Sequence, residues 1–270
     1  MRIKIDIRLI IMAMCCVFPV VGHVALASPY ANELVSFSQG SNGNSSYADG
    51  NATLGMPSRT TPAWGGGTQD VTVFNAPWAT DQIVSIGTGG SLVVKFDHHV
   101  LDNPSGTYWG IDFLIFGNTM YTDSSYPDGV AGGVASEPGK VQVSQDGINW
   151  YDVTAEADGE YCTQGYANTS TAYGSDGDVE SDFTKPVDPS FTISNGTTYS
   201  QILAGYNGSG GGTGVDFSST GLSWIQFVKV YQNGTDTWST EIDAFADVAP
   251  EPATMTLLGI GAAALLRRRK

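Results

Sequence analysis

Residues 110–118 read GIDFLIFGN, a short run in which almost every position between the glycines is apolar. From Ile111 to Phe116 the apolar side chains occupy odd and even positions alike, apart from Asp112. Because successive side chains of a strand point to opposite faces, this stretch predicts a strand that is covered on both sides. It therefore indicates a central strand of a β-sheet.

Other short β-prone runs flank this strand and are separated by turn residues. Val141 and Val143 lead into Asp146-Gly147, and residues 148–153 follow, which predicts a hairpin. No stretch of 28–249 shows an apolar helical period over three turns. Further β-rich runs are found at 91–96, 224–231 and 241–248. The pattern predicts an all-β fold, an antiparallel β-sandwich or jelly roll.

Polar, Gly-rich stretches separate these runs, and 34 of the 270 residues are Gly. We expect long surface loops at 38–70, 118–138 and 156–222. The last stretch is long enough to hold extra strands, around 191–193 and 199–203. The early and late strand groups need each other to close a sandwich, so we expect one domain over 28–249.

The N-terminus has the three parts of a secretory signal peptide. Basic residues at 2, 4 and 8 precede an apolar stretch, and Ala25-Leu26-Ala27 forms an A-x-A cleavage site. We therefore expect residues 1–27 to be removed and the exported chain to begin at Ser28. Cys162 is then the only cysteine, so no intramolecular disulfide can form, and we expect this side chain to be buried.

The C-terminus has a second tripartite pattern. Pro250-Glu251-Pro252 precedes an apolar stretch, 253–266, and a basic end follows that consists of Arg267, Arg268, Arg269 and Lys270. As a short helix the apolar stretch would be roughly 21 Å long, less than a hydrocarbon core of about 30 Å. It predicts a transient membrane association, with the basic end on the cytoplasmic side.

This tail, residues 250–270, resembles the PEP-CTERM sorting signal of Gram-negative bacteria. Pro250, Glu251 and Pro252 match the motif residue by residue. The resemblance implies recognition and processing by an exosortase, in organisms that export extracellular polysaccharide. We therefore expect an exported protein of the cell surface or extracellular space of a Gram-negative-type bacterium.

The charge is strongly acidic between two basic ends. Residues 28–249 contain 25 of the 27 acidic residues but only five of the 12 basic ones. Such a surface repels phosphate backbones, so nucleic acid is excluded as a partner. Solubility outside the cell explains the acidity, and cation binding is the functional alternative. Calcium takes six to eight oxygen ligands, and the run 176–182, DGDVESD, offers Asp176 and Asp178.

Most of the mature chain resembles a family of secreted bacterial cell-surface proteins. The likeness rests on residues 85–91, 110–118, 143–150, 183–189 and 241–245. It implies a surface location and a β-sandwich, but no reaction. A looser likeness, to galactose-binding-like sandwiches such as carbohydrate-binding modules, rests on residues 47–50 and 241–243. That likeness implies a composite calcium site that joins Asp49 to Glu241.

Residues for catalysis are few in the mature chain. Its two histidines, His98 and His99, are adjacent and would point to opposite faces of a strand. There is no G-x-S-x-G elbow, P-loop or dinucleotide fingerprint, and two histidines with one cysteine make zinc a poor fit. Glycoside hydrolysis needs a pair of carboxylates, but among so many acidic residues the presence of a pair does not indicate this activity. We therefore expect no enzymatic activity.

The six tryptophans are the remaining candidate functional residues. Trp150 and Trp224 lie in expected strands and are interpreted as core residues. Trp64, Trp109 and Trp238 lie beside loop residues, where exposed rings can stack on sugars. We expect a non-enzymatic surface or extracellular-matrix protein. The alternatives are a carbohydrate-binding module of the exopolysaccharide matrix and, third, a polysaccharide hydrolase or lyase.

Overall fold

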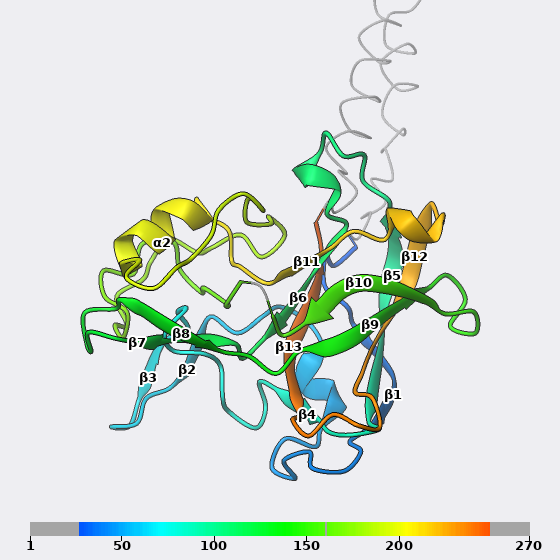
Figure 1. Cartoon of the computed structure of the whole chain (residues 1–270), viewed down its shortest axis with the longest axis horizontal. Coiled ribbons are helices and arrows are strands. Elements are labelled where there is room, and N and C mark those ends of the chain that lie inside the picture. The colour runs from blue at the N-terminus through cyan, green and yellow to red at the C-terminus, as the bar shows by residue number, and fades with distance from the viewer. Residues whose placement is uncertain (1–26, 160, 249–270) are drawn as a thin grey trace, which may run out of the picture.

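Two antiparallel sheets pack face to face in the computed structural model, which describes residues 27–159 and 161–248 (Figure 1). The larger sheet has the order β1 (Glu33–Ser38), β5 (Ser91–Leu101), β12 (Trp224–Tyr231), β9 (Gly139–Ser144) and β10 (Tyr151–Ala157). The smaller sheet has the order β11 (Thr213–Val215), β6 (Phe113–Gly117), β13 (Thr240–Asp247) and β4 (Val84–Ile86). The chain is therefore the all-β sandwich that the recurring β-prone runs predict.

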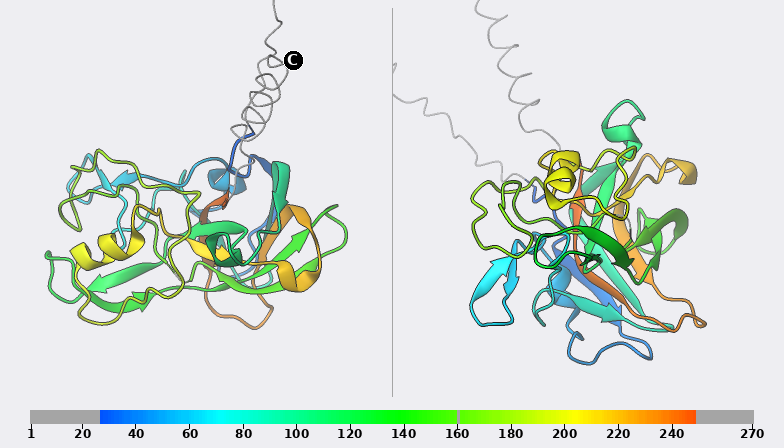
Figure 2. Two further views of the ribbon diagram at one scale, coloured as in Figure 1. Left: turned by 90° about the horizontal axis from the view of Figure 1, so that it is seen from above. Right: turned by 60° about the vertical axis from the view of Figure 1, so that its left-hand side comes forward.

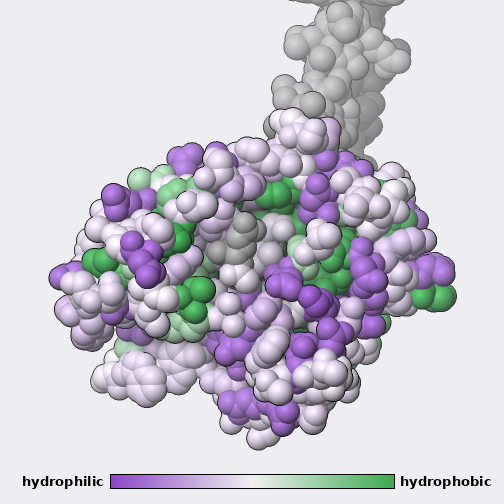
Figure 3. Space-filling view, in the orientation of Figure 1, coloured by the Kyte–Doolittle hydropathy of each residue, from purple (hydrophilic) through white to green (hydrophobic). Residues whose placement is uncertain are grey.

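Two hairpins and an α-helix lie to one side of the sandwich (Figures 1 and 2). The hairpins are β2 (Thr60–Pro62) with β3 (Thr68–Asp70), and β7 (Met120–Asp123) with β8 (Ala131–Ala135); the helix is α2 (Tyr199–Tyr206). The described residues also form three 3₁₀ turns: η1 (Gly50–Thr53), η2 (Tyr108–Gly110) and η3 (Ser218–Thr220). On the face shown in Figure 3, hydrophilic residues separate small hydrophobic patches.

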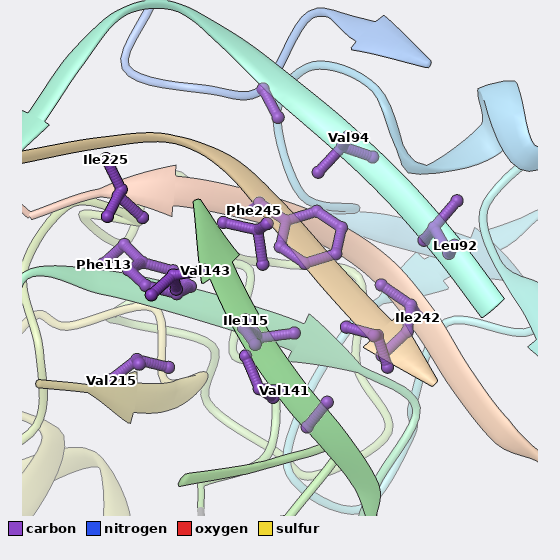
Figure 4. Close-up of a cluster of buried hydrophobic side chains, with 14 of the residues drawn as sticks. Leu92, Val94, Phe113, Ile115, Val141, Val143, Val215, Ile225, Ile242 and Phe245 are labelled. Carbon is purple, nitrogen blue, oxygen red and sulfur yellow. The ribbon is translucent and has the colours of Figure 1, made fainter. Parts of the chain in front are cut away.

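The core fills the space between the two sheets. Figure 4 shows Leu92 and Val94 of β5 opposite Ile242 and Phe245 of β13, and all four side chains are fully buried. Burial of one such side chain stabilises the fold by about 1.5–3 kcal/mol. Ile242 and Phe245 both reach the core because the register of β13 shifts between Ile242 and Ala244. This bulge interrupts the alternation of inward and outward side chains that an unbroken strand over the β-rich run 241–248 would have.

Strand β6 confirms the prediction made from GIDFLIFGN. It lies between β11 and β13, and all its residues are buried. Phe113 and Ile115 face the core between the sheets, whereas Leu114 and Phe116 face outward. On that outer side Phe183 packs edge-on against Phe116, with ring centroids 5.3 Å apart. The strand is apolar on both faces because the long segment after β10 covers the smaller sheet.

The long polar stretches contain more regular structure than expected. The prediction of a strand at 199–203 is wrong, because α2 covers these residues. Thr198 caps the helix by accepting the N–H of Gln201, whose side chain accepts the N–H of Thr198 in return. Residues 191–193 form no strand, and Phe191 packs its ring against Tyr206 of α2. Within the described ranges no helix is long and apolar enough to cross a membrane.

The β9–β10 hairpin forms where Asp146-Gly147 predicts it, but β10 begins at Tyr151 instead of Ile148. The carboxylate of Asp146 accepts the N–H groups of Ile148 and Asn149, which closes the turn over these residues. Trp150 therefore precedes the strand and is half-buried. Trp224 is in β12 as expected, yet it is also half-buried, so the core interpretation of both tryptophans is wrong. Cys162 is buried as predicted.

Candidate functional site

Both ends of the described chain lie at one end of the sandwich. Strand β13 ends at Asp247, whose N–H donates to the carbonyl of Pro29. The next N–H, that of Val248, donates to the carbonyl of Asp112 over 3.0 Å. We call this the tail-side end: it comprises Val248, the loop 102–112 and residues 216–217. The loop with η2 projects from it (Figure 1).

Three carboxylates, which we call the acidic trio, converge at the tail-side end. Asp102, Asp112 and Asp216 each offer an oxygen, and these oxygens lie within 4.8 Å of one another. Asp102 and Asp216 are exposed, whereas Asp112 is fully buried. Carboxylate oxygens are the ligands that Ca²⁺ prefers, so this group has the donor set for a cation. No other group of three metal-ligating side chains this close is present among the described residues.

The backbone holds Asp112 in place within this group. Its two carboxylate oxygens accept the N–H groups of Asn103 at 2.6 Å and Phe217 at 2.8 Å. Burial raises the pKa of Asp112 to about 7, although these two hydrogen bonds act to lower it. A bound cation would favour the charged form and reverse this shift.

Tyr108 and Trp109 form the tip of the loop 102–112. Their side chains are 40% and 48% exposed. Both have positive φ angles, 47° and 62°, and Gly110 follows with φ 85°. Non-glycine residues seldom adopt this left-handed region, so the loop holds its aromatic tip in a strained conformation.

His98 and His99 lie in β5 and point to opposite sides, as the sequence predicts. His98 Nε2 lies 2.8 Å from a carboxylate oxygen of Asp247, and Nδ1 lies 2.9 Å from one of Asp97. Burial acts to lower the pKa of His98, but the two carboxylates outweigh it and raise this pKa. His99 stacks on Trp224, with ring centroids 3.7 Å apart. The arrangement is an ion-pair network that ties β5 to β13.

The residues proposed for the composite calcium site lie near η1 and on β13. The Asp49 carboxylate caps η1 by accepting the N–H of Asn51 at 3.0 Å. Glu241 is half-buried and accepts a hydrogen bond from the Asn118 amide. Burial raises the pKa of Glu241. Neither carboxylate belongs to the acidic trio at the tail-side end.

The acidic loop, residues 176–182, also uses its carboxylates in local hydrogen bonds. Asp176 accepts hydrogen bonds from the backbone and hydroxyl of Ser170. Asp178 accepts one from the Asn168 amide. These bonds fold residues 168–178 onto themselves, and they leave other carboxylate lone pairs facing solvent. Sequence spacing pointed to this loop and missed the trio, whose members come from the loop 102–112 and from Asp216, more than 100 residues later.

The three candidate tryptophans lie on three different loops. Trp64 is 91% exposed between β2 and β3 and stacks on Trp78, with ring centroids 5.5 Å apart. Trp238 precedes β13 and donates its indole N–H to the carbonyl of Pro138. Strand β12 runs antiparallel to β5, so the loop of Trp238 is at the end of the sandwich opposite Trp109. The structure does not bring the three rings together.

A further buried carboxylate lies beside a shallow groove. Asp158 accepts the N–H and the hydroxyl of Thr119 with one oxygen, and its other oxygen has no hydrogen-bond partner. Burial, together with the negative charges of Glu137 and Glu241, raises the pKa of Asp158 to about 7, although the hydrogen bonds from Thr119 act to lower it. The groove is lined by Ser136, Pro138, Thr154, Ala155, Glu156, Gly159, Thr213 and Gly214.

The fold and the tail-side end define an all-β domain whose last strand leads directly into a C-terminal tail. Residues 248–270 match the PEP-CTERM protein-sorting motif. The tail is therefore a sorting signal of the exosortase type, and it directs export and surface sorting in bacteria. No curated protein matches the chain. Residues 1–26, with Ala25, and the tail itself, with Pro250 and Arg267, lie outside the described residues.

Proposed function

We propose that this protein is a non-enzymatic domain that a Gram-negative-type bacterium displays on its surface or in its extracellular matrix. The observation that carries the proposal is the sorting motif, which begins within one residue of the end of β13. An exosortase would process the tail after the signal peptide is removed. Intact-mass measurement of the mature protein tests this: the chain should start at Ser28 and lack the residues after about Pro252.

Carbohydrate binding is the alternative that a specific observation favours. Trp64 is almost fully exposed, and its stacking on Trp78 holds the ring ready for a sugar face. A glycan array with residues 28–249 should then show binding, and Trp64→Ala should lower the affinity about tenfold, or about 1.4 kcal/mol. Ile148→Ala, at another exposed apolar position, should leave it unchanged.

The same array separates binding from hydrolysis. Hydrolysis needs a carboxylic acid of raised pKa near a second carboxylate, and Asp158 and Glu241, whose pKa values are both raised and whose charges interact, are the candidate pair. New reducing ends in the presence of the protein would favour the hydrolase, and binding without them the module. If folded native protein binds no glycan and releases no reducing ends, surface display is the function that remains.

We further propose calcium as a stabilising ligand of the domain, supported by the acidic trio at the tail-side end. Binding to the native state alone should raise the melting temperature, by the equivalent of about 1.4 kcal/mol at a free concentration of tenfold Kd. Magnesium should act less, because it needs a tighter octahedral shell.

Variants assign the calcium effect to one site. Asp216→Ala should abolish it if the trio binds the ion, Asp49→Ala or Glu241→Ala if the composite site does, and Asp178→Ala if the acidic loop does. Differential scanning fluorimetry with each variant, with and without calcium, makes the comparison. Equal stabilisation by sodium chloride at matched ionic strength would contradict a specific site, because it would reflect charge screening.

A further inference from the structure

Two exposed aromatic side chains lie beside the point where the tail leaves the sandwich. Residues 104–109 are all exposed, and Tyr108 and Trp109 end this run. Trp109 is three residues before Asp112, so their Cα atoms lie within roughly 11 Å of each other. Asp112 in turn accepts the N–H of Val248, the last described residue. The aromatic tip and the start of the tail are therefore neighbours.

The link between the domain and the apolar stretch of the tail is short. Only four residues, 249–252, separate Val248 from Ala253, where that stretch begins. Five Cα–Cα steps span at most roughly 18 Å even when fully extended. While residues 253–266 are in a membrane, the tail-side end must therefore lie close to the membrane surface. The end that carries Tyr108 and Trp109 then faces the lipid headgroups.

We propose that Tyr108 and Trp109 contact the outer surface of the membrane while the tail is inserted, and so hold the sandwich tail-side down before processing. The inference rests on the proposed function, because it needs the tail to enter a membrane. Tryptophan and tyrosine concentrate at the membrane–water interface, where the ring meets acyl chains and the polar atom meets headgroups. An exposed loop tip with both residues fits that layer.

The charge around the tip favours zwitterionic lipid. Asp102 and Asp216 are exposed at the same end and would be repelled by anionic headgroups. The contact is therefore apolar and aromatic, and two rings give only weak attraction by themselves. The inserted tail compensates by keeping the loop at a high effective concentration near the surface. Cleavage of the tail removes that tether, and the domain should then leave the lipid.

The test uses the mature full chain, residues 28–270, in phosphatidylcholine vesicles. Ser105→Cys carries a nitrobenzoxadiazole label in the exposed loop, since Cys162 is buried and does not react. Ser45→Cys is the matched control. It follows β1, which ends beside Ser91 at the opposite end of β5. The label at 105 should brighten and shift its emission to shorter wavelength on insertion, whereas the label at 45 should not. Tyr108→Ser with Trp109→Ser should abolish the shift.

Flotation of the vesicles distinguishes a failure of the lipid contact from a failure of tail insertion. A chain that floats with vesicles but gives the same signal from both labels would overturn the lipid contact and leave tail insertion intact. A chain that does not float would overturn tail insertion, and the contact with it. A shift at 105 that occurs only in native membranes, and never in protein-free vesicles, would assign the aromatic tip to a protein partner and overturn the lipid contact.

Discussion

The free energy of unfolding of the mature domain should fall as the pH rises from 5 to 8, and Asp243→Asn should remove the part of that fall, about a third, that Asp243 contributes beside Asp112 and Asp158. Asp243 is only 2% exposed and accepts two hydrogen bonds, from the N–H and the hydroxyl of Ser58. Burial raises its pKa from near 3.8 to about 7, and these hydrogen bonds act to lower it. About two pKa units of this shift lie above pH 5, and at about 1.36 kcal/mol each they allow Asp243 an effect of up to roughly 3 kcal/mol between pH 5 and pH 8.

The sign follows from which form the fold prefers. A carboxyl whose pKa is raised by folding favours the native state below its unfolded pKa, and this stability is lost as the pH rises toward the folded value. For Asp243 the window is about pH 4 to pH 7. Asp112 and Asp158, whose pKa values are also raised to about 7, act in the same direction over the same window. His98, whose pKa is also raised, does so above its ordinary value of 6.5. Carboxyls with lowered pKa, such as Asp123, act below about pH 4, outside the measured range.

Chemical denaturation at pH 5 and pH 8 measures the effect. Asparagine can keep both contacts with Ser58, because its oxygen accepts the N–H and its amide donates to the hydroxyl. Asp243→Asn should therefore retain the stability at pH 5 and make the fall toward pH 8 smaller. Asp81→Asn, at an exposed position, is the control and should leave the slope unchanged. An identical slope for Asp243→Asn and the native chain would contradict the assignment.

Local patterns predicted the sandwich because its strands bury one or both faces along short runs. GIDFLIFGN gave β6, and Asp146-Gly147 gave the β9–β10 hairpin, since both features depend on neighbours in sequence. The bulge in β13 and the helix α2 were missed. The bulge depends on pairing with β6, and α2 is too short to show three turns of periodicity.

The acidic trio could not be predicted in the same way. Asp102 and Asp112 begin and end one loop, but Asp216 comes from a segment more than 100 residues later, and only the pairing of β11 with β6 brings it near. One signal was available: Asp112 is the single charged residue in an otherwise apolar strand sequence. A buried acid at such a position has partners, and the fold supplies the amides of Asn103 and Phe217.

Replacing Pro250-Glu251-Pro252 by Gly-Ser-Gly should block processing and trap a longer, membrane-bound protein in the native host. The replacement keeps the distance between β13 and the apolar stretch, so only the motif is changed. Pro250 and Pro252 lack backbone donors and favour an extended chain, which an enzyme can bind along its length. The apolar stretch, at roughly 21 Å as a helix, matches a bilayer core of about 30 Å poorly and suits a temporary stop.

Cell fractionation with intact-mass measurement gives an all-or-none readout of this change. The native protein should be recovered at the surface or in the medium, from Ser28 to about Pro252, whereas the variant should stay in the membrane and retain Arg267 to Lys270. A Gly-Ser-Gly replacement of residues 233–235, in the exposed loop before β13, is the control and should be processed normally. If the native mature protein itself keeps Arg267 to Lys270, the tail is a lasting anchor, because no cleavage near the motif has then taken place.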